Sequence, residues 1–371
     1  MPKYYMPTTL LSGNNCIKRH SHHIIRGEYA LIVTGRHSAV VSGALNDVTE
    51  VLKNNKIKYE IYDKVSDKTT ISDIYKLGTL MKEKGMDYLI GIGGGSTLDV
   101  AKAVSVYAAN DIEPMEIYQK QYEKDPFPVV CVPTTAGTGS DTTQYVMITL
   151  DNGEKKSYCA EQCFPYSTFL DSRYTRTMPP EVSRNTAVDA LCHAVESFLN
   201  SKASPFSDVM ALDAIRLIGK SSKALISGEF TDSDRENLLI AASEGGMALA
   251  YTGLNVVHAM GYQLTTQSGI PHGRANGTLL PDFLFWAAKQ EPMRAVKVID
   301  TFGTDLTSFK KIINKIIPTS ETFTSKDVEK WVRKSIVSTV SDNSIREMTS
   351  ADEIEIYTNA LVKKRSNYLE W

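Results

Sequence analysis

The sequence predicts an α/β domain built on a parallel sheet, followed by an all-helical domain. In the first half of the 371 residues, short β-branched runs alternate with amphipathic stretches, a pattern typical of a parallel sheet covered by helices. After Met178-Pro179-Pro180, helical patterns broken by Gly and Pro continue without convincing strands. Since the length also suits about two domains, we expect domains at 1–180 and 181–371.

Each element of the first half follows from its own pattern. Runs of aliphatic and β-branched residues such as YALIV and PVVCV predict buried strands, and the longer amphipathic stretches between them predict helices. The expected strands are 29–33, 58–62, 87–92 and 128–132, and the expected helices are 38–53, 72–84 and 97–109.

Composition excludes several classes of protein. With 41 Lys+Arg against 43 Asp+Glu, the net charge of -2 argues against nucleic acid as the main partner. No apolar run approaches the roughly 18 to 20 residues that span a bilayer, and the start of the chain does not resemble a signal peptide. The five cysteines contain no Cys-x-x-Cys pair, so neither a disulfide framework nor a zinc knuckle is favoured. We expect a cytoplasmic protein without membrane contact.

A glycine-rich loop follows the expected strand 87–92. Gly93, Gly94, Gly95 and Ser96 lead directly into the helix TLDVAKAV. Glycines let the backbone approach an anion, and the free N–H groups of a helix N-terminus stabilise phosphate charge. A tight strand-to-helix turn is the simpler alternative, but three consecutive glycines exceed what a turn requires. The loop comes too late in the chain to be the Rossmann fingerprint.

A second polar loop, PTTAGTGSD at 133–141, follows the strand 128–132. Alone it could be a solvated loop. However, it lies at the carboxyl end of a parallel strand, where open α/β sheets bind ligands. Two such loops on one sheet predict a dinucleotide-binding cleft.

The helical half contains candidate metal ligands. Asp189 and His193 are spaced i and i+4 in AVDALCHAVESF, so their side chains leave one helix face. Such a pair is more often a surface ion pair, but the apolar neighbours predict burial, and buried polar groups need partners. Glu196, three residues after His193, could orient that imidazole or could be an exposed charge.

His258 and His272 are candidate partners. On one straight helix they would stand about 21 Å apart, too far to share a metal. Gly269 and Pro271 allow the first helix to end and His272 to open a helix turned back toward His258. One Asp and three His with a position left open would form a catalytic site for Fe²⁺ or Zn²⁺.

At this point the chain resembles the iron-containing, group III alcohol dehydrogenases. The matching segments occur in the family's order and spacing, and together they are highly specific. They are GIGGGSTLDVAKA (91–103), PTTAGTGSD (133–141), MPPEV with DALCHAVESF (178–198) and VHAMGYQLTTQSGIPHGRAN (257–276).

The resemblance implies a dehydroquinate synthase-like architecture, with a nicotinamide and a divalent metal facing each other between a nucleotide-binding domain and a helical domain. It also implies a homodimer or larger homo-oligomer. By motif, the metal ligands fall on Asp189, His193, His258 and His272, and the pyrophosphate loop on Gly93, Gly94, Gly95 and Ser96. The second nucleotide loop falls on Thr134, Thr135 and Thr138, and the loop-helix pattern includes Asp99 and Lys102.

Two positions depart from the family pattern. Many members carry a further histidine one helical turn after the third ligand, where it assists proton exchange, and here that position is Tyr262. We predict a catalytic role for Tyr262, with packing as the alternative. The PTT loop usually ends in Glu, whereas this chain has Asp141.

The residues after the first expected strand predict the cofactor. Many NAD-preferring relatives place an Asp just beyond Val-Thr, whereas this chain has Gly35, followed by Arg36 and Ser38. Loss of the carboxylate removes repulsion of a 2′-phosphate, and the guanidinium and hydroxyl could bind that phosphate. We therefore expect NADP(H) rather than NAD(H), although Arg36 could be a solvated loop charge.

The expected reaction is hydride transfer between NAD(P)H and a small primary alcohol or aldehyde. A dehydroquinate synthase-like lyase is one alternative, but it would need several cations near the metal, and only Arg274 is close to the ligands in sequence. A non-catalytic nucleotide sensor is the other alternative, and it would need no open metal position.

Overall fold

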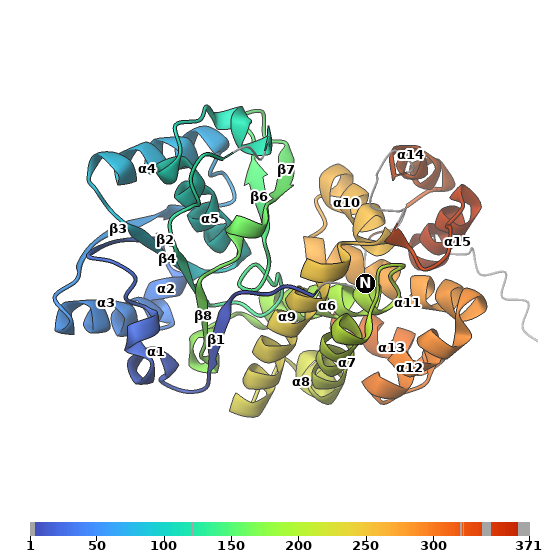
Figure 1. Ribbon diagram of the computed structural model, residues 1–371. Coiled ribbons are helices and arrows are strands. Elements are labelled where there is room, and N and C mark those ends of the chain that lie inside the picture. The colour runs from blue at the N-terminus through green and yellow to red at the C-terminus, as the bar shows by residue number, and fades with distance from the viewer. Residues whose placement is uncertain (1–3, 120–121, 320, 322, 336–342, 363–371) are drawn as a thin grey trace, which may run out of the picture. The chain divides into compact units, whose positions relative to one another are not determined.

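The structure is a computed structural model that describes residues 4–119, 122–319, 321, 323–335 and 343–362 (Figure 1). The chain forms two compact units. The first, here the sheet unit, holds Tyr5–Pro179 together with Thr231–Ala250. The second, the helical unit, holds Tyr4, Pro180–Phe230 and the described residues from Tyr251 onward. The structure places Thr231–Ala250 in the sheet unit. The expected domains 1–180 and 181–371 stay a prediction.

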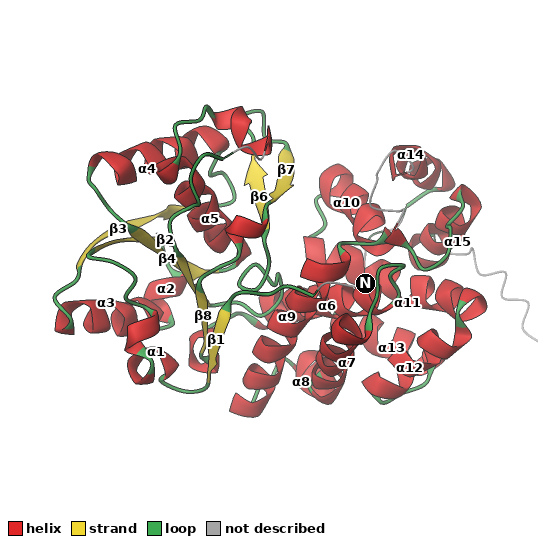
Figure 2. Ribbon diagram, viewed as in Figure 1, coloured by secondary structure: helices red, strands yellow, loops and turns green. Residues whose placement is uncertain are grey.

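The sheet unit contains a parallel sheet of six strands in the order β1-β8-β5-β4-β2-β3 (Figure 2). Every residue of β4 and β5 is buried, as expected for strands covered on both faces. The predicted α/β fold class is thus confirmed, and the four predicted strands form β2 to β5. The strands are β1 (Thr9–Ser12), β2 (Tyr29–Gly35), β3 (Lys58–Val65), β4 (Tyr88–Gly93), β5 (Val129–Pro133) and β8 (Ser167–Leu170).

The short strands β1 and β8 and an antiparallel hairpin, β6 (Tyr145–Thr149) with β7 (Lys155–Cys159), were not predicted from the sequence. The single helix expected over 38–53 is also wrong. The chain forms α2 (Ser38–Val41) and α3 (Ala44–Asn54) instead, because Gly43 between them has a φ of 83°, which residues with a β-carbon rarely adopt. The remaining helices of this region are α1 (Cys16–Arg19), α4 (Ile71–Glu83) and α5 (Gly95–Ala109).

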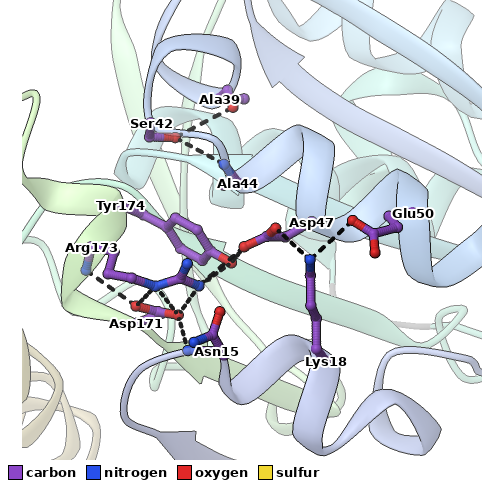
Figure 3. A network of polar contacts seen from close by, with 10 residues as sticks. All are labelled: Asn15, Lys18, Ala39, Ser42, Ala44, Asp47, Glu50, Asp171, Arg173 and Tyr174. Carbon is purple, nitrogen blue, oxygen red and sulfur yellow. Dashed lines mark hydrogen bonds and ion pairs between the residues drawn. The ribbon is translucent and has the colours of Figure 1, made fainter.

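A polar network joins the end of β8 to α1 and α3, as Figure 3 shows. Arg173 donates to the carboxylates of Asp171 and Asp47, and the Tyr174 hydroxyl donates to Asp47 at 2.8 Å. Burial alone would raise the pKa of Asp47, but the hydrogen bonds from Tyr174 and Arg173 outweigh it and lower that pKa. The ionised carboxylate therefore stabilises the packing of α3 against the segment that follows β8 at neutral pH.

Helix α9 (Asp232–Thr252) contributes its first nineteen residues to the sheet unit although it comes from the second half of the chain. Ser243 donates to the buried Asp141 carboxylate at 2.6 Å, and its carbonyl accepts from the Thr142 hydroxyl at 3.0 Å. A β-carbon on Gly139 would lie 2.6 Å from the Cα of Gly246. The loop 133–141 and α9 therefore pack backbone to backbone.

The helical unit contains no β-strand among its described residues, which confirms the all-helical prediction. None of the helices that the structure describes is long and apolar enough to cross a membrane. Its helices are α6 (Pro180–Phe198), α7 (Pro205–Lys220), α8 (Ser222–Ser227), α10 (Val256–Ser268), α11 (His272–Gln290), α12 (Pro292–Phe302), α13 (Leu306–Ile316), α14 (Ser325–Ser335) and α15 (Ser350–Leu361).

Candidate active site

The chain reverses between α10 and α11, as the sequence predicts. Gly269 caps the end of α10 with a φ of 68°, and Pro271 precedes His272, the first residue of α11. This positive φ favours glycine. The reversal brings His272 back beside His258, whose ring centroid lies 5.5 Å from that of His272.

Asp189, His258 and His272 form a group whose ligand atoms all lie within 4.8 Å of one another. Asp189 Oδ1 is 3.6 Å from His258 Nε2 and 3.8 Å from His272 Nε2. Asp189 and His258 are buried, whereas the His272 side chain is 46% exposed. The group therefore opens to solvent on the His272 side.

His193, the fourth predicted ligand, is not part of this group. Its ring is buried and stacks on that of His258, with the centroids 4.7 Å apart and the planes 11° apart. The structure thus brings three of the four predicted ligands together and places the fourth against the face of one of them.

The three side chains fit a divalent cation. Two imidazole nitrogens and a carboxylate oxygen are a donor set used by Zn²⁺ and Fe²⁺. Bonds of about 2.1 Å in a tetrahedral arrangement separate ligand atoms by about 3.4 Å, close to the distances from Asp189 Oδ1. Within the described structure, His258 Nε2 is buried and has no hydrogen-bond partner, which a bound cation would provide.

The electrostatics of the group favour a cation. Burial opposes ionisation of Asp189, but the neighbouring imidazoles His193, His272 and His258 outweigh it and hold its pKa below the ordinary range. Burial would lower the pKa of His258, but the carboxylates of Glu196 and Asp189 outweigh it and raise that pKa above its ordinary range. The two acids therefore create a site for positive charge.

Glu196 contacts His258, which the sequence interpretation did not anticipate. Its Oε1 accepts the backbone N–H of His258 at 3.2 Å, and its Oε2 meets Nδ1 of the same residue. The sequence interpretation paired Glu196 with His193 because they are close along α6. In the structure α10 packs beside α6 and brings His258 into contact with Glu196.

Asn276 is a site residue that sequence reasoning missed. Its Nδ2 donates to Asp189 Oδ1 at 2.9 Å and lies 3.2 Å from His272 Nε2. A β-carbon on Gly261 would lie 1.9 Å from Asn276 Oδ1, so the glycine makes room for the amide. The i and i+4 spacing from His272 was the sequence feature that could have indicated Asn276.

Two glycines of α11 set its distance from α6. A β-carbon on Gly273 would lie 1.9 Å from the carbonyl oxygen of Asn185, and one on Gly277 would lie 2.1 Å from Val188 Cγ1. Glycines spaced four apart lie on one helix face. This close approach brings His272 within reach of Asp189.

The glycine loop and the second polar loop meet at the carboxyl edge of the sheet unit. Gly93 ends β4, Gly94 caps α5 and Gly95 begins it, and Thr134 donates its N–H to the Gly93 carbonyl at 2.9 Å. A β-carbon on Gly95 would lie 2.6 Å from Thr138 Oγ1. The two loops interlock and are compatible with a single binding surface.

Within this surface, Ser96 and Thr138 are exposed, Thr135 is half-buried and Thr134 is buried. A β-carbon on Gly94 would lie 3.2 Å from the Thr135 side chain. The N-terminus of α5 thus combines an exposed hydroxyl with a glycine backbone, a combination that phosphate sites use.

Asp99 is buried inside the sheet unit. Its Oδ2 accepts the N–H of Met147 at 3.0 Å, and its Oδ1 lies 3.7 Å from the ammonium of Lys102. Lys102 is fully buried and donates to the Thr143 carbonyl at 2.9 Å. In these contacts Asp99 and Lys102 tie the β6 region to α5, and the predicted cofactor role of Asp99 stays a prediction.

The residues predicted to select the cofactor lie at the carboxyl end of β2. Gly35 is the last residue of β2, Arg36 is exposed, and Ser38 is the exposed first residue of the short helix α2. A β-carbon on Gly35 would lie 3.3 Å from the Val65 carbonyl, a tight but adjustable contact. Tyr262 is half-buried on α10, one turn after His258.

Comparisons with known proteins agree with the site. The sequence matches the family described as iron-containing alcohol dehydrogenase over residues 7–172 and its C-terminal family over residues 183–361. The probable alcohol dehydrogenase EutG of Salmonella typhimurium is 38% identical over 213 residues, which are 57% of this chain and 54% of EutG. The match thus spans about half the length of that relative.

Two further relatives are matched over more of their length. Lactaldehyde reductase of Escherichia coli is 32% identical over 265 residues, which are 70% of this chain and 68% of the reductase. The crystal structure of an iron-containing alcohol dehydrogenase from Thermotoga maritima is 35% identical, with a TM-score of 0.87 over 97% of this chain and 99% of that one. On these matches and the residues assembled above, the chain belongs to the iron-containing alcohol dehydrogenase family.

Proposed function

We propose that the protein is a metal-dependent alcohol dehydrogenase or aldehyde reductase that uses NAD(P)H and acts on a small primary alcohol or aldehyde. The observation that carries this proposal is the group of Asp189, His258 and His272, which is closed on the buried side and open at the exposed His272. Relatives named as an alcohol dehydrogenase and a lactaldehyde reductase support the same reaction class.

In this proposal the ligand group holds Fe²⁺ or Zn²⁺, which supplies Lewis acidity toward the oxygen of the aldehyde or alcohol. Asp189 contributes negative charge, and the two imidazoles contribute neutral nitrogens. Burial of Asp189 and His258 excludes water from the inner side of the site. The interlocked loops of the sheet unit bind the cofactor pyrophosphate at the N-terminus of α5.

The test is turnover of a panel of short aldehydes with NADPH and NADH, together with metal analysis of the purified protein. We expect saturable oxidation of the reduced cofactor and about one divalent metal per chain. Cofactor binding without turnover of any aldehyde would favour the sensor alternative. For the lyase alternative, Arg274 is already ion-paired with Glu321, so a polyanionic substrate would lack this cation.

The cofactor preference gives a first prediction. We expect kcat/KM with NADPH to exceed that with NADH by roughly one to two orders of magnitude, as one or two charged hydrogen bonds provide. Gly35→Asp should reverse much of this preference, because a carboxylate at the end of β2 repels the 2′-phosphate and bonds a ribose hydroxyl.

Gly35→Ala is the matched control, because it adds the same β-carbon near the Val65 carbonyl without a charge. The alanine variant should keep the preference for NADPH. Equal kcat/KM with both cofactors in the unmodified enzyme would refute the assignment of Gly35, Arg36 and Ser38.

Tyr262 gives a second prediction. If its hydroxyl passes a proton between the substrate oxygen and solvent, Tyr262→Phe should lower kcat by about 10²-fold and change its pH profile. Tyr262→His should recover much of the rate. A phenylalanine variant with an unchanged pH profile would assign Tyr262 to packing.

A homodimer or larger assembly and a cytoplasmic location stay predictions of the sequence. Gel filtration with light scattering at several concentrations measures the first of these.

A further inference from the structure

The carboxylate of Glu196 is enclosed in the helical unit, and both of its oxygens contact one residue. Glu196 is 1% exposed. Oε1 accepts the backbone N–H of His258, and Oε2 meets its ring nitrogen Nδ1. The carboxylate thus fixes both the backbone and the ring of His258.

Asp189 and Glu196 contact opposite nitrogens of this imidazole. They stand seven residues apart on α6, which places them on the same helix face. Asp189 Oδ1 lies 3.6 Å from Nε2, while Glu196 Oε2 meets Nδ1. The stacked His193 ring covers one face of the same imidazole. These contacts fix both the position of the His258 side chain and the orientation of its ring.

An ionised carboxylate only accepts hydrogen bonds. Its contact with Nδ1 therefore requires a proton on that nitrogen, and in a neutral imidazole the lone pair is then on Nε2. Nε2 is the atom that faces Asp189 and has no hydrogen-bond partner among the described residues. A histidine that binds a metal through one nitrogen commonly donates its other N–H to a carboxylate.

We propose that Glu196 is a positioning residue that holds His258 in the tautomer with its lone pair at Nε2, so that this nitrogen is available to a metal. The inference rests on the proposed metal-dependent function. It gives Glu196 a role through His258, without contact with substrate or cofactor.

Glu196→Gln tests the tautomer at constant side-chain volume. The amide oxygen of Gln would accept the backbone N–H of His258, which leaves its NH₂ group facing Nδ1. That NH₂ donates a hydrogen bond, so it favours the lone pair on Nδ1 and the proton on Nε2, the tautomer that cannot bind a metal through Nε2. Glu196→Ala removes both contacts but imposes no tautomer.

The experiment measures the affinity of the full chain for Zn²⁺ and Co²⁺ by competition with a chelator, and the visible spectrum of the Co²⁺-loaded protein. We expect Glu196→Gln to weaken metal binding by about 10 to 100-fold. Its loss of metal affinity should be at least as large as that of Glu196→Ala. A residue that only fills space would give the opposite order, because Gln preserves volume and Ala does not. The Co²⁺ spectrum should change in the Gln variant.

Asp282→Asn is the matched control. Asp282 is another buried carboxylate of the helical unit, on α11, and it pairs with Lys310 at 2.7 Å. Its substitution should lower thermal stability and leave the metal affinity and the Co²⁺ spectrum unchanged.

Wild-type affinity and spectrum in Glu196→Gln would overturn the inference while leaving the proposed function intact, whereas failure of the unmodified protein to bind metal would refute the proposed function itself. If the Gln variant does not fold, ¹⁵N spectra of histidine-labelled, Zn²⁺-loaded wild type provide the test. The signals of His258 are those missing from the spectrum of His258→Ala. A proton on Nδ1 of His258 supports the inference, and a proton on Nε2 overturns it.

Discussion

Replacing His258 with alanine is expected to remove the bound metal and to lower kcat/KM by about 10³-fold or more. The reason is that Lewis acidity contributes several kcal/mol to the transition state, and each 1.36 kcal/mol is a factor of ten in rate. His272→Ala should behave similarly. Metal content by mass spectrometry, kcat/KM and NADPH affinity are the measurements, and NADPH affinity should change little because the glycine loop is untouched.

His22→Ala is the control for this experiment, since His22 is an exposed histidine of the short segment Ser21–His23 in the sheet unit. It should keep full metal content and rate. Full metal content and rate in His272→Ala would contradict the ligand assignment. His193→Ala, measured in the same way, determines whether the imidazole stacked on His258 joins the ligands.

Replacing Gly273 with alanine is expected to destabilise the protein by about 3 kcal/mol, the upper end of the usual cost of overpacking. The added β-carbon would overlap a backbone carbonyl, that of Asn185, which cannot rotate away as a side chain can. Because His272 precedes Gly273, displacement of α11 from α6 should also weaken metal binding by at least about 10-fold. Urea unfolding and chelator competition measure the two effects.

Gly303→Ala is the control, because it is also a glycine-to-alanine substitution but its added β-carbon overlaps no other atom. Gly303 has a φ of 86° and open space around its Cα, so alanine there should cost about 1 to 2 kcal/mol through backbone strain alone. Its metal affinity should stay that of the unmodified protein. Wild-type stability and metal affinity in Gly273→Ala would show that the contact between α6 and α11 does not set the ligand spacing.

Strands β2, β4 and β5 were predictable because each contains an apolar run that is buried on both faces. Strands β1 and β8 were not, because they are four residues each and half of their residues carry hydroxyls. The buried hydroxyls of β8 donate hydrogen bonds to carbonyl groups that are distant in sequence. Ser167 donates to the carbonyl of His23, and Thr168 donates to that of Asp141. Such pairing cannot be inferred from local periodicity.

The candidate ligands could be predicted from the sequence because helical spacing and a Gly-Pro turn are local features. The residues that contact these ligands could not be predicted. Glu196 contacts His258 across 62 positions and Asn276 contacts Asp189 across 87, so both contacts depend on how closely three helices pack. The glycines at 261 and 273 control that packing, and their effect becomes apparent only when the neighbouring helices are in place.

Because α9 belongs to the sheet unit, that unit cannot finish folding during synthesis until α9 has been made. The loop 133–141 is made early, but Ser243, the partner of its buried Asp141, is made about a hundred residues later. Domains usually fold as units during synthesis. Here the sheet unit includes α9, which is synthesised after α6, α7 and α8 of the helical unit. We therefore expect a nascent chain stopped near residue 180 to remain protease-sensitive, and one extended beyond residue 250 to become protected in that loop.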